Sequence, residues 1–143
     1  MPPDSLCNFI NLRELSLYDN QIKEIPDSFS NLVNLQHLSL SNNQIKKIPY
    51  SFSNLVNLQK LWLGNNQIKE LPISIINLRR LSIFKIDNNP IEIVNPIVQR
   101  FLDRINNRGG NIYNVYDNRQ NVHTSSIQQS IKKSIINILS FSL

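Results

Sequence analysis

Few side chains in this 143-residue chain could perform chemistry, and their spacing fits no catalytic or metal-binding pattern. The only cysteine, Cys7, and the two histidines, His37 and His123, leave no Cys-x-x-Cys or His-x-x-x-His pair that could bind zinc. His123 follows Asp117 by six residues, but nothing in the sequence fixes the geometry that such a pair would need to orient a nucleophile. The three glycines do not form a phosphate-binding loop. We therefore expect a protein that is not an enzyme and that holds no metal or cofactor.

Trp62 is the side chain best suited to a different task, the binding of a protein partner. It is the only tryptophan of the chain, and it lies between Leu61 and Leu63. Neighbouring side chains of a strand point to opposite faces, so an indole between two buried leucines faces solvent. Tryptophan and tyrosine are enriched among the residues that contribute most to binding at interfaces. Trp62 therefore predicts a binding surface on the solvent side of a strand.

Trp62 lies in a repeated sequence pattern, and this pattern predicts how its strand packs against neighbouring strands. Copies of a 23-residue unit start at residues 12, 35 and 58, an altered copy starts at residue 81, and the partial repeat 1–11 precedes them. Each copy has two apolar residues two positions apart, which share one side of a short strand. Stacked copies can bury these residues in interior columns, which no single copy could do. The first two columns are Leu15, Leu38, Leu61 and Phe84, and then Leu17, Leu40, Leu63 and Ile86.

The solvent-facing positions of the stacked strands form three columns whose residues change from copy to copy. These columns are Glu14, His37, Lys60 and Ile83; then Ser16, Ser39, Trp62 and Lys85; then Tyr18, Ser41, Gly64 and Asp87. We expect the partner-binding residues to be Trp62, Tyr18, His37, Lys60, Lys85 and Glu14. In this hypothesis Trp62 is the central contact, and the other five surround it with polar groups.

The spacing Leu-x-x-Leu-x-Leu-x-x-Asn-x-Ile resembles the leucine-rich repeat. Because an Ile-Pro or Leu-Pro pair follows in the first three units, the chain is most similar to the short repeats of Scribble- and Erbin-like intracellular scaffolds. The resemblance covers residues 3–94. It implies an α/β repeat solenoid with a curved parallel sheet on its concave face, and protein partners. The absence of alanine and the abundance of asparagine and isoleucine also resemble proteins of AT-rich genomes, such as those of giant viruses that infect amoebae.

One asparagine recurs in every unit at the point where the strand ends. These residues are Asn20, Asn43, Asn66 and Asn89. A side-chain amide has both donors and an acceptor, so at a buried turn it can satisfy backbone groups that would otherwise lack partners. The resemblance implies that these asparagines form a structural ladder along the solenoid, and we expect them to have that role.

A helix is expected after the repeats of residues 1–94. Asn95 is a suitable N-cap, and Pro96 suits the first helical position. The apolar residues that follow at helical spacing are Ile97, Val98, Phe101, Leu102 and Ile105. Two glycines then end the pattern. We expect residues 95–110 to form a C-terminal capping helix that covers the last repeat.

Residues 111–143 predict a strand followed by an amphipathic helix. Apolar and polar residues alternate over residues 111–116, and isoleucines recur at helical spacing over residues 127–139. The C-terminal part is basic, since residues 95–143 contain six Lys or Arg and two acidic residues, against nine and eight in residues 1–94. A basic tail can attract nucleic acid or anionic lipid. However, no groove-reading motif is present, so we do not expect nucleic-acid binding.

The N-terminal end predicts a weak contact between copies. Leu6, Phe9 and Ile10 are apolar residues before the first complete unit, and no polar cap precedes them. We expect weak self-association through this end. The sequence has neither an N-terminal apolar run typical of a signal peptide nor a membrane-spanning segment. These features favour an intracellular, cytoplasmic protein, in the host cytoplasm if the source is viral.

The main hypothesis is a non-enzymatic module that binds an unidentified protein partner through the concave face of the repeats. One alternative is a substrate-recruiting adaptor fragment of a ubiquitin-ligase-like system, which a longer relative would reveal. Another is docking of the basic tail on nucleic acid or a membrane, which would give salt-dependent binding.

Overall fold

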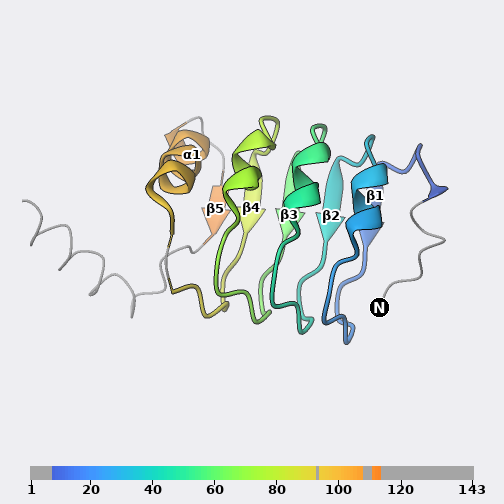
Figure 1. Cartoon of the computed structure of the whole chain (residues 1–143), viewed down its shortest axis with the longest axis horizontal. Coiled ribbons are helices and arrows are strands. Elements are labelled where there is room, and N and C mark those ends of the chain that lie inside the picture. The colour runs from blue at the N-terminus through green and yellow to red at the C-terminus, as the bar shows by residue number, and fades with distance from the viewer. Residues whose placement is uncertain (1–7, 93, 108–110, 114–143) are drawn as a thin grey trace, which may run out of the picture.

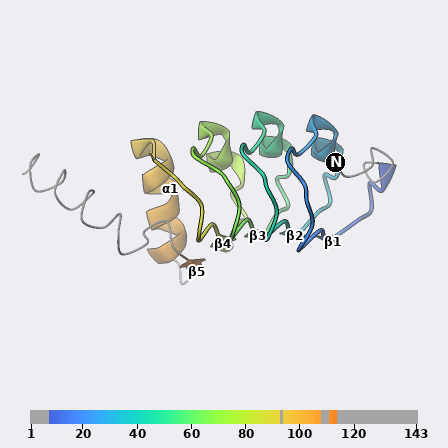
Figure 2. The same cartoon turned by 90° about the horizontal axis from the view of Figure 1, so that it is seen from below.

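Each repeat forms one turn of a solenoid, with a short strand on one side and a 3-10 helix on the other (Figures 1 and 2). The structure is a computed structural model that describes residues 8–92, 94–107 and 111–113. The turns stack side by side along the long axis, and the C-terminal helix follows the last of them. The predicted repeat solenoid with a parallel sheet and a capping helix is confirmed.

The sheet has five parallel strands that pair in the order of the sequence. They are β1 (Glu14–Ser16), β2 (His37–Ser39), β3 (Lys60–Trp62), β4 (Ile83–Lys85) and β5 (Asn111–Tyr113). Equivalent positions of the first four copies are in register, so Leu15 pairs with Leu38, Leu38 with Leu61, and Leu61 with Phe84. Because of this register, equivalent residues of successive strands line up in the columns expected from the sequence, on both faces of the sheet.

The fifth strand adds a feature that the repeat pattern does not contain. β5 lies after the C-terminal helix in sequence, yet it pairs with β4 through Ile83 and Asn111 and through Phe84 and Ile112. A strand was expected from residue 111 to residue 116; the described part is Asn111–Tyr113. The sheet therefore continues by one strand beyond the last repeat.

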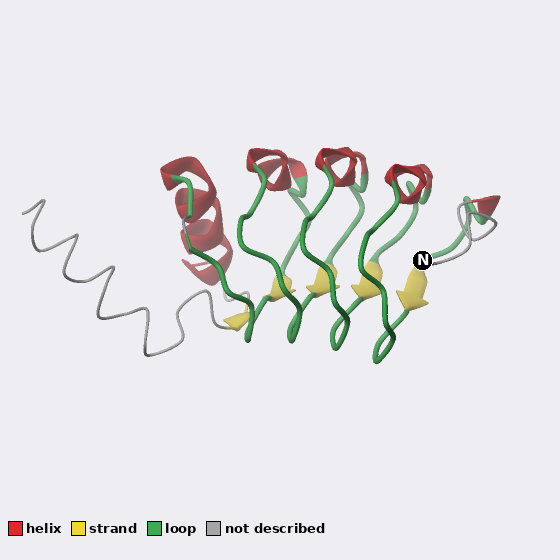
Figure 3. Ribbon diagram, turned by 60° about the horizontal axis from the view of Figure 1, so that its bottom comes forward, coloured by secondary structure: helices red, strands yellow, loops and turns green. Residues whose placement is uncertain are grey.

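The return side of each turn is a 3-10 helix that begins after a proline. These helices are η2 (Asp27–Asn31), η3 (Tyr50–Asn54) and η4 (Ile73–Asn77). Pro26, Pro49 and Pro72 are their N-caps, with extended backbone, and each proline carbonyl accepts a hydrogen bond of 3.1 Å from the residue three positions later. Proline suits this position because it fixes φ and its missing N–H is not needed there. Figure 3 shows the helices on the side opposite the strands.

The core lies between the sheet and these helices and runs the length of the array. Phe29, Phe52 and Ile75 fill it from the helix side, while the leucines of the strands fill it from the other. At the N-terminal end, Leu12, Leu15 and Leu17 are only partly buried, because no preceding strand covers them among the described residues. Phe9 and Ile10 are each 57% exposed. Weak self-association through this end stays a prediction, and Leu6 lies outside the described residues.

The C-terminal helix α1 (Pro96–Asn107) packs against η4 and β5. Its start is capped by the Asn95 carboxamide oxygen, which accepts a hydrogen bond of 2.8 Å from the Ile97 N–H. Its buried residues are Val98, Phe101, Leu102 and Ile105. The sequence analysis also assigned Ile97 to this apolar stripe, and the structure corrects that assignment because Ile97 is 48% exposed. The buried four share one helical face, whereas Ile97 is rotated by about 100° from Val98.

Several predictions concern residues outside the described part of the chain. They include Cys7, His123, the strand beyond Tyr113 and the helix expected over residues 127–139. Of the six basic residues in the C-terminal part, Arg100 and Arg104 lie on α1, and the other four are not described. Among the described residues, no helix has the length and apolar character needed to cross a membrane.

Candidate functional site

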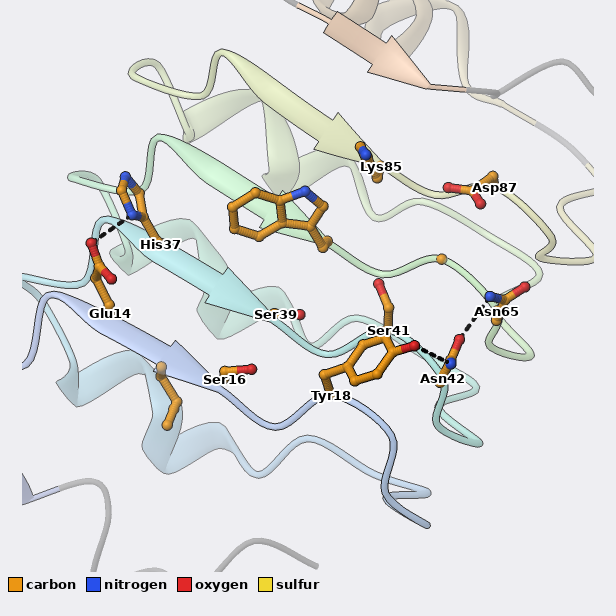
Figure 4. A pocket seen from close by; sticks show the side chains of 13 residues that line it. Glu14, Ser16, Tyr18, His37, Ser39, Ser41, Asn42, Asn65, Lys85 and Asp87 are labelled. Carbon is orange, nitrogen blue, oxygen red and sulfur yellow. Dashed lines mark hydrogen bonds and ion pairs between the residues drawn. The ribbon is translucent and has the colours of Figure 1, made fainter.

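A groove of about 670 Å³ crosses the solvent face of β1 to β4 (Figure 4). We call it the concave groove. It is lined by Glu14, Leu15, Ser16, Tyr18, His37, Ser39, Ser41, Asn42, Trp62, Gly64, Asn65, Lys85 and Asp87. Every one of these residues except Leu15 belongs to a solvent-facing column or to the turn that follows a strand. The groove is therefore built from the solvent-facing columns, in which most residues differ between repeats, and from the turns that follow the strands.

The depth of the groove comes from small residues between two large rings. Trp62 on β3 pairs in register with Ser39 on β2, and Ser39 in turn pairs with Ser16 on β1. Beyond the strands, the Asp19 N–H bonds to the Ser41 carbonyl at 3.0 Å, so Tyr18 comes close to Ser41. Serine side chains are short, so β2 forms a low floor between the indole on one side and the phenol on the other. A partner side chain could enter this space.

The Trp62 ring is held by a contact from the neighbouring strand. Its centroid is 6.4 Å from that of His37, and the two rings meet edge to face at 79°. His37 is held in turn by Glu14, whose carboxylate oxygen lies 2.9 Å from the imidazole Nδ1. Glu14 and His37 are register partners on β1 and β2, which explains why they meet. Trp62 is thus positioned through a chain of two contacts that spans three strands.

The Tyr18 ring is held from its other end by a row of asparagines. The Asn42 amide donates a hydrogen bond of 2.9 Å to the Tyr18 hydroxyl oxygen (Figure 4). Asn65 donates to the Asn42 carboxamide oxygen at 2.7 Å, and Asn88 donates to that of Asn65 at 2.7 Å. We call Asn42, Asn65 and Asn88 the outer row. Although Tyr18 is 55% exposed, its hydroxyl is therefore fixed by a neighbouring repeat.

The backbone of the outer row explains its residue type. Asn42, Asn65 and Asn88 have positive φ values of 57°, 54° and 54°, and Asp19 occupies the same position in the first copy with φ of 58°. In this left-handed region asparagine and aspartate are favoured over other residues with a side chain. The sequence analysis missed the outer row. Its signal was an asparagine directly before each of the asparagines at positions 43, 66 and 89, with an aspartate before Asn20.

The asparagines predicted as a structural ladder lie one residue later and point toward the core. The Asn43 amide donates to the carbonyl of Leu17 in the preceding repeat and to that of Leu40 in its own, at 3.0 and 2.9 Å. Its oxygen accepts the Ile22 N–H at 3.0 Å. Asn66 and Asn89 repeat this arrangement one and two copies later. The Asn20 side-chain amide is exposed, and in the described part of the chain it donates to two carbonyls of its own repeat, those of Leu17 and Tyr18.

Five of the six residues predicted to bind a partner line the concave groove. They are Trp62, Tyr18, His37, Lys85 and Glu14. Lys60 pairs in register with His37 but does not line the groove. Their role in binding remains a prediction. Ser41, Asn42, Asn65 and Asp87 line the groove without having been predicted as site residues.

Gly64 makes room for a side chain of the next repeat. A Cβ atom at Gly64 would lie 2.9 Å from Oδ1 of Asp87, so the glycine leaves space for that carboxylate. Gly64 is buried, and the Asp87 carboxylate lies over the backbone that follows β3. In the described part of the chain, no group of three or more His, Cys, Asp or Glu could hold a metal ion.

Comparison with known proteins agrees with the repeat geometry. Residues 10–55 and 33–74 each match the family model for two copies of the leucine-rich repeat. The stacked strand and 3-10 units, with a recurring asparagine after each of the strands β1 to β4, define a leucine-rich repeat solenoid. The chain belongs to the leucine-rich repeat proteins.

Solved structures of leucine-rich repeat proteins are similar to this chain over much of its length. A leucine-rich repeat protein of Leptospira interrogans is 32% identical with a TM-score of 0.68, and the match covers 80% of this chain and 28% of that one. The BIR2 ectodomain of Arabidopsis thaliana is 30% identical with a TM-score of 0.61, over 67% of this chain and 52% of that one. The plant peptide hormone receptor RGFR1, in complex with RGF2, is 34% identical with a TM-score of 0.57, over 61% and 14%.

The chain spans less than two thirds of the length of each of these three proteins. A comparison with curated proteins found no match. The similarity therefore establishes the family and the fold, and the function has to be argued from the groove.

Proposed function

We propose that this chain is a non-enzymatic interaction module that binds a protein partner in the concave groove, with Trp62 as the central contact. The observation that carries this proposal is the pair of aromatic rings held apart over a floor of serines. Trp62 is fixed by His37 and Glu14, and Tyr18 is fixed by the outer row. These contacts come from neighbouring repeats, so the solenoid itself holds the two rings.

The physical advantage of fixed rings is a smaller entropy cost on binding. An interface side chain that is immobilised by a partner loses about 0.5–1.5 kcal/mol of rotamer freedom. A ring already held by its neighbours loses less, so more of the contact energy contributes to affinity. Trp62 is partly exposed, and a partner that covers it gains apolar burial in addition. Alanine substitution of such a central tryptophan can weaken binding by about 2 kcal/mol or more.

The shape of the groove favours an extended segment of the partner over a flat surface. The groove crosses four parallel strands and has a low floor between raised side chains, so a narrow chain can enter it. Among the similar structures, the plant receptor RGFR1 is described as a peptide hormone receptor and was solved in complex with RGF2. That description supports a peptide-like partner for the present groove.

Affinity capture with matched variants tests the proposal. Wild-type protein and the Trp62→Ala and Lys46→Ala variants are used as bait under identical conditions, and bound proteins are compared quantitatively. Lys46 is exposed and lies outside the groove, so its substitution controls for surface changes. We expect Trp62→Ala to lose the proteins that wild type and Lys46→Ala retain. Equal retention by all three proteins would contradict binding through the groove.

A further inference from the structure

The two ends of the concave groove differ in the chemistry that they offer. Where the strands begin, the lining includes His37, which is paired with Glu14. Where the strands end, the lining side chains are Tyr18, Ser41, Asn42, Asn65 and Asp87. This second end carries one formal charge, and it is negative.

The Asp87 carboxylate is the group that makes this end unusual. Among the described residues, it has neither a hydrogen bond nor an ion pair, although its residue is only partly exposed. Gly64 leaves the space in which it lies, and any larger residue there would push it away. In the described part of the chain, the carboxylate therefore has no salt-bridge partner at the wall of the groove. A partner that supplies a positive charge would satisfy it.

We propose that the strand-end half of the groove holds one lysine or arginine side chain of the partner's extended segment, beside Tyr18 and with its charge against Asp87. This inference rests on the proposed function and specifies the partner chemistry at one position. The face of tyrosine attracts cations within about 6 Å of the ring centre. Tyr18 and Gly64, over which Asp87 lies, stem from chain segments two positions apart, roughly 10 Å across the sheet, which leaves room for one side chain above Ser41.

Lys85 also lines the groove and carries a positive charge, so its position matters. It pairs in register with Trp62, whereas Asp87 is two residues further along the chain, about 6.6 Å towards the strand ends. The partner's cation is therefore expected beyond the level of Lys85, where Asn42 and Asn65 present carboxamide groups and no positive charge.

Peptide titrations followed by fluorescence test this inference directly, because Trp62 is the only tryptophan of the chain. The probes are three capped pentapeptides, Gly-Gly-X-Gly-Gly, in which X is arginine, glutamine or glutamate. We expect the arginine peptide to change Trp62 emission saturably and to bind about tenfold more tightly than the glutamine peptide, because it adds cation–π and charge contacts. The glutamate peptide should bind least.

Two charge-matched variants locate the effect. Asp87→Asn removes the groove carboxylate, and Glu70→Gln removes an exposed carboxylate outside the groove with the same change in net charge. Asp87→Asn should abolish the preference for arginine over glutamine, and Glu70→Gln should preserve it. Equal binding of the arginine and glutamine peptides, tighter binding of the glutamate peptide, or no binding of any peptide at millimolar concentration would overturn the inference. The capture experiment with Trp62→Ala is scored separately, so the groove can bind a partner even if the cation site is wrong.

Discussion

The two faces of the sheet follow opposite rules although they are built from the same short strands. On the core face, the residues at one position are nearly the same in every repeat, as in Leu38, Leu61 and Phe84, because each must fill the same space between equal neighbours. On the solvent face, most residues change from one repeat to the next, as from Ser39 to Trp62 to Lys85. The residues of the core face therefore specify the solenoid, and the residues of the solvent face specify the groove.

The asparagines show the same contrast between adjacent positions. Asn43 and Asn66 are buried and bond to backbone groups of successive turns, so they stabilise the fold. Asn42 and Asn65, one residue earlier, bond from side chain to side chain in solvent and end at the Tyr18 hydroxyl. A shift of one residue along the chain therefore changes the hydrogen-bond partners of the asparagine side chain from backbone groups to side chains that line the groove. Substitutions at these positions should therefore separate stability from binding.

The largest expected effect is on the core side, at the capping helix. Phe101→Ala should lower the free energy of unfolding by about 3–5 kcal/mol, because it removes a buried ring and leaves a cavity beside the last repeat. Ile97→Ala, on the exposed side of the same helix, should cost much less. Chemical denaturation of both variants measures the difference. Equal losses would mean that α1 does not cap the core through its buried face.

The inner asparagines come next in magnitude. Asn43→Ala should lower stability by about 1–3 kcal/mol, because the Ile22 N–H and the Leu40 carbonyl lose a partner in a buried place. Asn20→Ala serves as its matched control, since the Asn20 side chain is exposed and, among the described residues, donates only to carbonyls of its own repeat. Thermal and urea unfolding should rank Asn43→Ala well below Asn20→Ala. An unchanged melting temperature for Asn43→Ala would refute the structural role of this asparagine.

The outer row should affect binding more than stability. Asn42→Gly removes the donor to the Tyr18 hydroxyl without left-handed backbone strain, since glycine tolerates positive φ. The exposed hydrogen bond is worth about 0.5–1.5 kcal/mol, so the fold should persist while partner capture weakens. Asn88→Gly has the same backbone geometry but lies at the far end of the row, away from Tyr18. If both variants capture partners equally well, the row does not position Tyr18 for binding.

The smallest expected effect is at Ser74 on the helix side. The Ser51 hydroxyl donates to Asp27 at 2.7 Å, but Tyr50 stands where the matching carboxylate of Ser74 would be. The Ser74 hydroxyl is buried and has no hydrogen-bond partner among the described residues. Ser74→Ala should therefore be neutral or slightly stabilising, whereas Ser51→Ala should cost about 0.5–1.5 kcal/mol. Calorimetric melting of the pair checks this, and the reverse order would contradict it.

The fold was predictable because the same pattern of apolar residues recurs in every repeat. Two apolar residues at a spacing of two, copied every 23 residues, fix both the strand and its register. The solvent-facing columns follow from the same alternation, and most of the residues predicted on them do line the groove. The capping helix was visible from its apolar spacing, although one residue of the stripe was assigned to the wrong side.

The part of the site that could not be predicted depends on how the side chains of neighbouring repeats are oriented. The His37 and Trp62 rings meet diagonally across two strands, and Asp87 occupies the space over Gly64. Both depend on side-chain orientation, which spacing in sequence does not encode. The pairing of β5 with β4 was also missed, because the chain reaches that edge only after α1. The outer row was recognisable in principle from its recurring asparagines but required the positive φ values for interpretation.

We expect the partner to contact the solvent face of the sheet, and not the side of the 3-10 helices. Photo-crosslinking tests it most directly, with a photoreactive phenylalanine analogue placed either at Ser16 or at Tyr50. Ser16 lies on β1 in the concave groove, and Tyr50 lies on η3 on the opposite side and is 68% exposed. If the partner binds in the concave groove, we expect its covalent capture from Ser16 and none above background from Tyr50. Equal or greater capture from Tyr50 would contradict it.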